Sequence, residues 1–293
     1  MLAPRREEPS LAFGGQALIE GVMMRSRKHL VICVRQPNNE ILTHKEKINS
    51  LSEKHRILRL PFLRGIIALF ETLYLGVKGL YFSANAVLEE EEKFTHKEFG
   101  IAIALALALA SFFFIIPFLL TNLLGLTGVV FNIVEAIVRL TIFLLYLTLI
   151  AMWGEFKRIL QYHGAEHKTI NAHEAGVALN VVNVKKFSRL HPRCGTSFLF
   201  IVMIVSILLF SIMPDLGFIV RLAYRVLLIP VIGAISYELL KLSDRYKDSM
   251  IMKIFTLPGL AFQRLTTKEP DDDMMEVAVE AVKEVRRLSD SDS

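Results

Sequence analysis

Charged side chains are missing from long parts of this 293-residue chain. Residues 100–124 contain none, and residues 129–152 contain only Glu135 and Arg139. A helix of this length can cross a hydrocarbon core about 30 Å thick. Hydrophobic residues make up 53% of the chain, more than the ~45–50% of an ordinary soluble domain. The sequence therefore excludes a soluble globular enzyme and a disordered chain, and predicts a protein that crosses a membrane several times.

Cysteine is also scarce. Cys33 and Cys194 are the only two, and they lie far apart, so they cannot form a disulfide framework and the chain is not a secreted disulfide scaffold.

The glycine-rich run at residues 13–25 is not a phosphate loop, because it lacks the G-x-x-x-x-G-K-[ST] and G-x-G-x-x-G patterns.

Four apolar segments predict an all-α membrane protein with two transmembrane helical hairpins. They cover residues 100–124, 129–152, 197–213 and 216–240. We expect a kink at Pro117 in the first segment. Only a few residues separate the two members of each pair, which is typical of helices joined by tight turns.

The distribution of lysine and arginine predicts the topology. Three of the 34 lie within the predicted spans, and none of the other 31 lies in a tight turn; all of those fall in residues 1–99, 153–196 or 241–293. The positive-inside rule places these regions, with both termini, on the cytoplasmic side of the membrane. The net charge of +5 then reflects contact with membrane lipids, not with nucleic acid.

This topology divides the chain into six parts. They are an N-terminal cytoplasmic region with a β-hairpin (1–56), an amphipathic or re-entrant helical segment (57–99), the first transmembrane hairpin (100–152), a cytoplasmic loop with His, Glu and Cys clusters (153–196), the second transmembrane hairpin (197–240) and a cytoplasmic C-terminal tail with an amphipathic helix (241–293). The expected cytoplasmic face thus has both α and β structure.

Two of these parts carry specific local signals. Strand-like runs at residues 30–35 and 40–45 flank Pro37-Asn38-Asn39, which predicts the β-hairpin. Residues 57–88 are rich in Leu, Ile and Phe, but Pro61 and three glycines should interrupt any long helix there. A fifth span would disturb the charge topology, so we expect an amphipathic or re-entrant helix on the cytoplasmic leaflet.

The C-terminal tail predicts a helix that begins near Pro270, with three aspartates in its first turn and basic residues in its last. Its apolar residues form one stripe of Met275, Val279, Val282 and Val285. We expect this stripe to dock on another element.

The richest set of metal-ligand side chains lies in residues 153–196. Nothing strongly breaks the helix from the second span before Gly176, so His163 and His167 should point the same way, four residues apart. With Glu166 they match the H-x-x-E-H pattern of inverted zincins, in which two imidazoles hold zinc and the carboxylate is the general base.

A second cluster precedes the third span and contains His191 and Cys194. Either could complete the metal shell, so we predict a divalent metal, zinc first, at His163, His167, His191 and Cys194. The plainer alternative is that the histidines bond to neighbouring backbone. A third interpretation makes Cys194 a nucleophile, because a nearby arginine and a helix N-terminus lower the pKa of a thiol.

Other charged residues also have two interpretations. Glu20 could supply a carboxylate ligand or pair with Arg25. The structural alternative is that the glycine-rich run at residues 13–25 is a tight elbow that packs on the membrane domain. Within the spans, Glu135 could pair with Arg139. The side chains of Arg139, Arg221 and Arg225 would then extend toward the membrane–water interface. The alternative is a polar pocket for an anionic lipid head group.

Four strings resemble the bacterial YqhQ-like family: residues 14–25, 163–168, 191–198 and 263–271. The resemblance runs in order from about residue 11 to residue 285. It implies a multi-pass bacterial membrane protein with a domain of unknown function, often labelled a predicted metal-dependent enzyme. It implies no substrate or reaction.

Our leading hypothesis, for an inner-membrane protein, is a divalent-metal site on the cytoplasmic face, with Glu166 as the candidate general base. If the site is catalytic, the simplest chemistry is hydrolysis of a membrane-associated substrate by a metal-activated water. The second hypothesis is a non-enzymatic scaffold or assembly factor that binds a protein partner, motivated by residues 57–88 and the C-terminal apolar stripe. A transporter is the third. Four spans are few for an alternating-access carrier, although a homo-oligomer would escape that objection.

Overall fold

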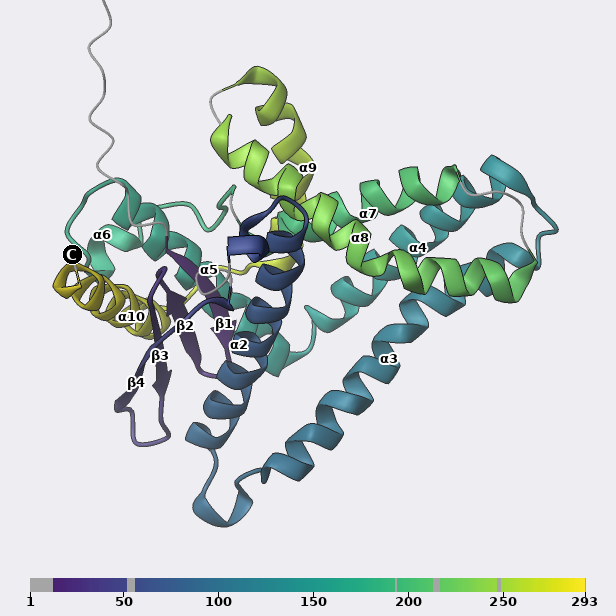
Figure 1. Cartoon of the computed structure of the whole chain (residues 1–293). Helices are drawn as coiled ribbons and strands as arrows, with labels where there is room; N and C mark the ends of the chain where they lie inside the picture. The colour runs from purple at the N-terminus through teal and green to yellow at the C-terminus, as the bar shows by residue number, and fades with distance from the viewer. Residues whose placement is uncertain (1–12, 52–55, 193, 213–216, 247–248, 293) are drawn as a thin grey trace, which may run out of the picture.

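The computed structural model describes residues 13–51, 56–192, 194–212, 217–246 and 249–292. It combines a small antiparallel sheet with long helices (Figure 1). The strands are β1 (Gly14–Leu18), β2 (Gly21–Arg25), β3 (His29–Arg35) and β4 (Ile41–Lys47). The helices are η1 (Arg56–Arg59), α2 (Leu63–Val87), η2 (Glu90–Glu92), α3 (His96–Asn122), α4 (Gly128–Ile150), α5 (Gly154–Glu174), α6 (Val181–Val184), α7 (Gly195–Ser211), α8 (Phe218–Arg245), α9 (Met250–Thr266) and α10 (Asp272–Ser291).

The sheet is a meander in the order β1-β2-β3-β4. The predicted hairpin is confirmed as β3 and β4, which pair from His29 opposite Lys47 to Arg35 opposite Ile41. Asn39 closes its turn with φ of 68°, a backbone angle that asparagine tolerates.

The glycine-rich run near the N-terminus forms a second hairpin, β1 and β2. The tight elbow predicted there is therefore wrong. The strands of this second hairpin pack against α5 and α2. Glu20 lies in the two-residue turn with φ of 50°.

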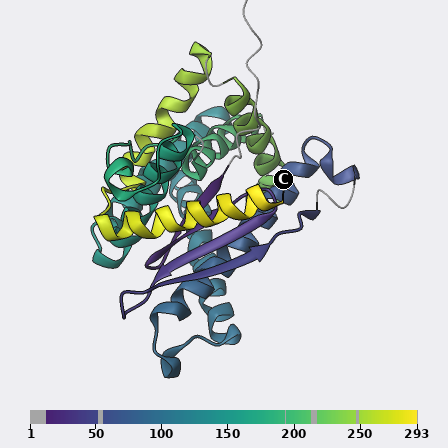
Figure 2. The same cartoon turned by 90° about the vertical axis from the view of Figure 1, so that its left-hand side faces the viewer.

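β3 is buried on both faces, and Figure 2 shows α10, in yellow, lying across one face of the sheet. Val31 and Cys33 pack with α5 and α10, whereas the alternate residues of β3 face α2. The predicted docking stripe of α10 is confirmed, because Met275, Val279, Val282 and Val285 all lie in the core that this helix forms with the sheet. We call β1–β4 with α5, α6 and α10 the sheet module.

α2 is one continuous 25-residue helix, so the expectation that glycines interrupt it is wrong. Each of its glycines lies where another element approaches closely. A Cβ at Gly65 would lie 3.1 Å from Tyr237 of α8, and one at Gly79 would lie 3.2 Å from Leu18 of β1. Close packing therefore offsets the weak helix propensity of glycine.

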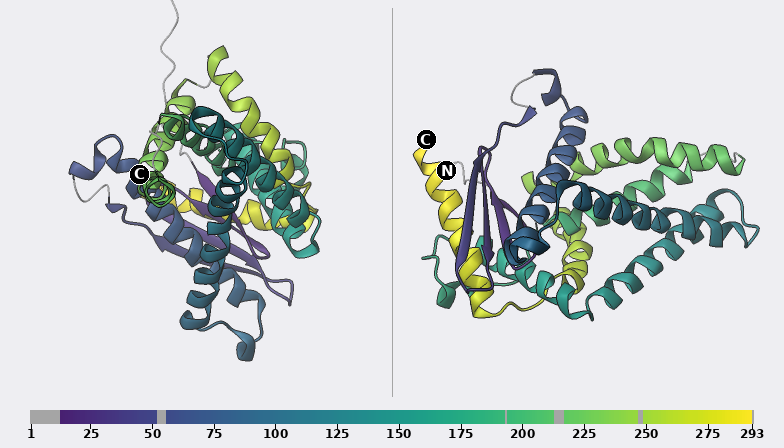
Figure 3. Two further views of the ribbon diagram at one scale, coloured as in Figure 1. Left: turned by 90° about the vertical axis from the view of Figure 1, so that its right-hand side faces the viewer. Right: turned by 90° about the horizontal axis from the view of Figure 1, so that it is seen from below.

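Three helices in the described part of the chain are long and apolar enough to span a membrane: Leu63–Val87, Gly128–Ile150 and Ile219–Ser243; Ser197–Ser211 is a shorter apolar helix. These helices are compatible with membrane association. α3 covers most of the first predicted span, with Pro117 inside it. Figures 1 and 3 show α3, α4, α7 and α8 extending away from the sheet module. The turn predicted at residues 214–215 lies outside the described residues.

The helix after the second predicted span departs from expectation. α4 ends at Ile150, and α5 begins as a separate helix at Gly154. The prediction that the helix of the second span continues up to Gly176 is therefore wrong. The break lets α5 lie against the sheet, where Tyr162 and Ala165 are fully buried.

Candidate metal centre

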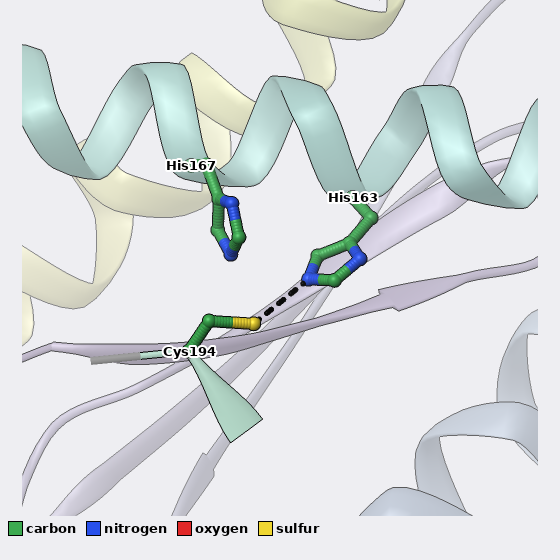
Figure 4. Close-up of side chains that lie close together, drawn as sticks. All are labelled: His163, His167 and Cys194. Atoms are coloured by element: carbon green, nitrogen blue, oxygen red, sulfur yellow. Dashed lines mark hydrogen bonds between the residues drawn. The ribbon is translucent and has the colours of Figure 1, made fainter. Parts of the chain in front are cut away.

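His163 and His167 meet Cys194 at the junction between α5 and α7. The ligand atoms of the three residues all lie within 4.8 Å of one another. The two imidazole centroids are 4.4 Å apart, and Nε2 of His163 is 3.2 Å from Sγ of Cys194. Figure 4 shows both rings pointing from α5 toward the cysteine. We call these three residues the His–Cys centre.

Backbone carbonyls fix the tautomers of both histidines. Nδ1 of His163 lies 2.7 Å from the carbonyl oxygen of Thr266, and Nδ1 of His167 lies 2.7 Å from that of Arg189. A carbonyl can only accept, so each Nδ1 carries the proton and donates it. Each Nε2 therefore keeps its lone pair, which is the usual arrangement for a histidine that binds a metal through Nε2.

Burial also keeps these imidazoles neutral. It lowers the pKa of His163, against the opposing effect of the bond to Thr266. It lowers the pKa of His167 further, and the neighbouring His163 adds to the effect. Neutral imidazole is the form that coordinates a metal.

His191 borders the His–Cys centre but is not one of its three residues. Its ring centroid is 5.8 Å from that of His167, and its Nε2 lies 3.4 Å from a carboxylate oxygen of Glu174. Gln263, which is fully buried, holds the His191 backbone from both sides. The His191 amide donates to Gln263 Oε1 at 2.8 Å, and Gln263 Nε2 donates to the His191 carbonyl at 2.7 Å.

Glu166, the predicted general base, lies on α5 between the two histidines in sequence but packs against β1. A Cβ at Gly15 would lie 2.5 Å from its carboxylate oxygen. Burial raises the pKa of Glu166 to about 8, so it is mostly protonated at neutral pH in the metal-free chain. Its role as base stays a prediction.

Glu20 takes neither of its two predicted roles. Its carboxylate makes a two-pronged ion pair with Arg158 of α5, at 2.5 and 2.6 Å. Arg25 instead lies 4.0 Å from Glu71 of α2. The Glu20 pair therefore ties the β1–β2 turn to α5 and supplies no ligand.

Comparison with known proteins assigns the family. The family model described as "Protein of unknown function (DUF1385)" matches residues 60–288. The chain belongs to this family. The "Uncharacterized protein YqhQ" of Bacillus subtilis (strain 168) is 36% identical over 301 residues, which cover 94% of this chain and 93% of the relative. The resemblance to YqhQ-like proteins is thus confirmed. No solved structure matches the chain.

Sequence reasoning missed the residues that hold the His–Cys centre in place through hydrogen bonds. Thr266, Arg189 and Gln263 come from two other segments, and the sequence marks only the string at residues 263–271, without a role. Gly164 was missed too. The segment after α9 crosses α5 so closely that a Cβ at Gly164 would overlap the Lys268 carbonyl. The Lys268 amide donates to the Leu160 carbonyl at 2.8 Å, so this crossing fixes the Thr266 carbonyl.

Proposed function

We propose that this chain is a zinc-binding, multi-pass protein of a bacterial inner membrane, and that its His–Cys centre serves a hydrolytic reaction on a membrane-associated substrate. One observation carries the proposal. Both Nδ1 atoms are held by backbone carbonyls at 2.7 Å, which leaves both Nε2 lone pairs beside the Cys194 sulfur. Carbonyl bonds alone would also suit structural histidines, so the support for a metal comes from the ligand atoms of both rings meeting a buried cysteine sulfur.

The donor set fits zinc in particular. Two imidazole nitrogens and one thiolate are ligands that zinc prefers, and three protein ligands leave a fourth position open, as in catalytic sites. Zinc bound there would supply Lewis acidity toward a carbonyl or phosphoryl oxygen. His191 lies beside His167 and is paired with Glu174, which suits it to position a substrate.

Glu166 keeps its proposed role as the proton-transfer residue. A protonated carboxyl at neutral pH is a general acid, and positive charge nearby would lower its pKa and make it a base. Glu166 is only 5% exposed, so an exchange of protons with bulk water would need movement around Gly15.

For the membrane topology we propose four spans, α3, α4, α7 and α8, with the sheet module in the cytoplasm. α2 is apolar and long enough for a fifth span, but its polar contacts argue against it. Lys78 pairs with Glu46 of β4 at 2.5 Å, and Glu71 accepts from Ser50 at 3.0 Å. A spanning α2 would carry these charged strands into hydrocarbon.

The direction of α2 supports the same placement. Figures 1 and 3 show it running crosswise to α8. Away from the sheet it exposes Phe70, Leu73 and Tyr74. A helix with one face on the sheet module and one apolar face outward suits the membrane surface.

Metal analysis of detergent-purified protein tests the proposal. We expect about one zinc per chain in wild type by elemental mass spectrometry, and loss of zinc in His163→Ala/His167→Ala and in Cys194→Ser. The matched control is His173→Ala on the same helix, which contacts Phe13 and should keep the metal. Cobalt added to the apo protein should give a thiolate charge-transfer band that disappears in Cys194→Ser.

Purified wild type that holds no metal, and takes up neither added zinc nor added cobalt, would refute the proposal. The scaffold hypothesis would then lead, although one of its two motives has weakened. The α10 stripe that suggested a partner surface is already covered by the chain's own sheet.

A further inference from the structure

A large cavity lies among α4, α7, α8 and α9, away from the His–Cys centre. Its volume is about 750 Å³, within the usual range for ligand sites of ~300–1,000 Å³. Most of its lining is apolar and includes Phe143, Phe198, Val202, Met203, Ile229 and Leu265. Hydrocarbon is the chemistry that such walls accept.

Two arginines, Arg139 of α4 and Arg225 of α8, line the same cavity. Arg225 is only 6% exposed, and it shares the buried carboxylate of Glu135 with Arg139. The distance from Arg225 Nη1 to Glu135 Oε1 is 2.8 Å. Among these three groups, two cations thus share one anion.

In the part of the chain that the structure describes, the remaining contacts of Arg225 do not supply a second anion. Its Nη2 donates to Asn132 Oδ1 at 3.3 Å, and its guanidinium lies 4.7 Å from the ring centroids of Phe118 and Phe210. Within the described residues, Arg225 Nε is buried and has no hydrogen-bond acceptor. A buried guanidinium with an unused donor is costly unless an acceptor reaches it.

We propose that this cavity binds an anionic lipid. Its oxyanion head group pairs with Arg139 and Arg225, and its chain packs along Phe143, Phe198 and Leu265. The head group is a phosphate or a carboxylate, because both offer the oxygen acceptors that guanidinium prefers. The proposal does not depend on metal binding, since none of the His–Cys centre lines the cavity.

Lipid binding to delipidated, full-length protein in neutral detergent tests this inference. Native mass spectrometry would compare phosphatidylglycerol, palmitate and, as the uncharged control, zwitterionic phosphatidylcholine. We expect wild type to retain phosphatidylglycerol or palmitate in preference to phosphatidylcholine. Retention of phosphatidylglycerol would identify a phospholipid, and retention of palmitate alone would identify a fatty acid.

Arg139→Gln is the decisive variant, because it leaves Glu135 and Arg225 as a balanced pair. We expect anionic-lipid binding to fall roughly tenfold or more, as for the loss of a charged hydrogen bond. Without lipid, its melting temperature should equal or exceed that of wild type, because one of two like charges is gone. Added lipid should raise the melting temperature of wild type only.

Two further variants distinguish the binding of the lipid head group from the binding of its acyl chain. Arg221→Gln removes a nearby arginine that does not line the cavity, so binding should survive. Val202→Trp narrows the apolar part and should weaken binding of both anionic lipids. Equal retention of phosphatidylcholine, wild-type binding by Arg139→Gln, or no lipid binding at all would overturn the proposal.

Discussion

The carbonyl oxygen of Thr266 lies 2.7 Å from Nδ1 of His163, across 103 residues of chain. This contact fixes which ring nitrogen faces Cys194, and it depends on how closely the segment after α9 crosses α5. Gly164 permits that crossing, because any Cβ there would overlap the Lys268 carbonyl. The glycine in the H-G-A-E-H string therefore has a structural task in the His–Cys centre.

Gly164→Ala should thus weaken both the fold and the metal site. Overpacking of this kind costs about 1–3 kcal/mol, and the displaced segment would carry the Thr266 carbonyl with it. Thermal unfolding and zinc content would be measured together. Gly154→Ala on the same helix is the control, since open space surrounds that position. Full zinc and wild-type stability in Gly164→Ala would contradict the proposed crossing.

The contact between Gly15 and Glu166 predicts a coupled pair of substitutions. Gly15→Ala places a methyl 2.5 Å from the Glu166 carboxylate and should destabilise the sheet module. Adding Glu166→Ala removes the obstructing atoms, so the double variant should be less destabilised than the sum of the single variants. A coupling of about 0.5–3 kcal/mol is typical of residues in contact.

A double-mutant cycle by chemical denaturation measures this coupling. Gly14→Ala is the matched control in the same strand, because a methyl group at that position would have no other atom within 4 Å. It should be neutral or slightly stabilising, since alanine restricts the unfolded chain. Additive effects of Gly15→Ala and Glu166→Ala would show that the two residues do not touch.

Local sequence patterns were sufficient for elements that carry a clear period and a recognisable turn. The β3–β4 hairpin had turn residues at 37–39, and α10 had one apolar stripe with matching end charges. β1 and β2 had neither signal. β2 in particular is buried on both faces, so its sequence does not alternate between polar and apolar residues. In α2, glycine propensity argued against the helix that tertiary packing produces.

In the candidate site, too, local sequence predicted some features, and others depend on contacts between distant segments. The spacing of His163 and His167 is a local property, so the sequence predicted that they share a face. Cys194 lies 31 residues beyond His163 and was proposed from its ligand type. The carbonyl of Thr266 has no side-chain signature at all, so no residue pattern could reveal it. Only the folded chain brings these groups together.

The raised pKa of Glu166 predicts a pH-dependent stability in the metal-free protein. Between its ordinary value of 4.5 and about 8, the folded chain keeps a proton that the unfolded chain releases. The free energy of unfolding should therefore fall as pH rises through this window, by up to about 1.36 kcal/mol per pH unit, or on the order of 5 kcal/mol in all. Below pH 4.5 this contribution is fully present.

Glu166→Gln removes that titration and should flatten the profile, with the largest gain in stability near pH 8. Denaturant unfolding of chelator-treated protein from about pH 4.5 to about pH 8.5 would show it. Glu155→Gln on the same helix changes an exposed carboxylate and should leave the wild-type slope in place. An unchanged slope in Glu166→Gln would mean that another group controls the profile.

Gln263 should link the stability of the 188–194 segment to metal affinity. Its amide bonds both the N–H and the carbonyl of His191, and it is fully buried. Gln263→Leu fills the space but leaves both backbone groups without these partners, at a cost of about 1–3 kcal/mol for each buried group. Because His191 precedes Cys194 by three residues, the thiolate would lose its fixed position. Outer-shell substitutions of this kind typically reduce metal affinity about 10–100-fold.

Competition with a zinc chelator measures that loss, alongside thermal unfolding of the apo protein. Gln263→Glu separates the two bonds, because it keeps the acceptor for the His191 amide and loses the donor to its carbonyl; its zinc affinity should fall between wild type and Gln263→Leu. Gln161→Leu is the control, since that amide contacts the Glu269 carbonyl at 3.2 Å at the surface. If Gln263→Leu lost stability but kept wild-type zinc affinity, the amide would support the fold alone, and the position of Cys194 would have to be fixed by α7.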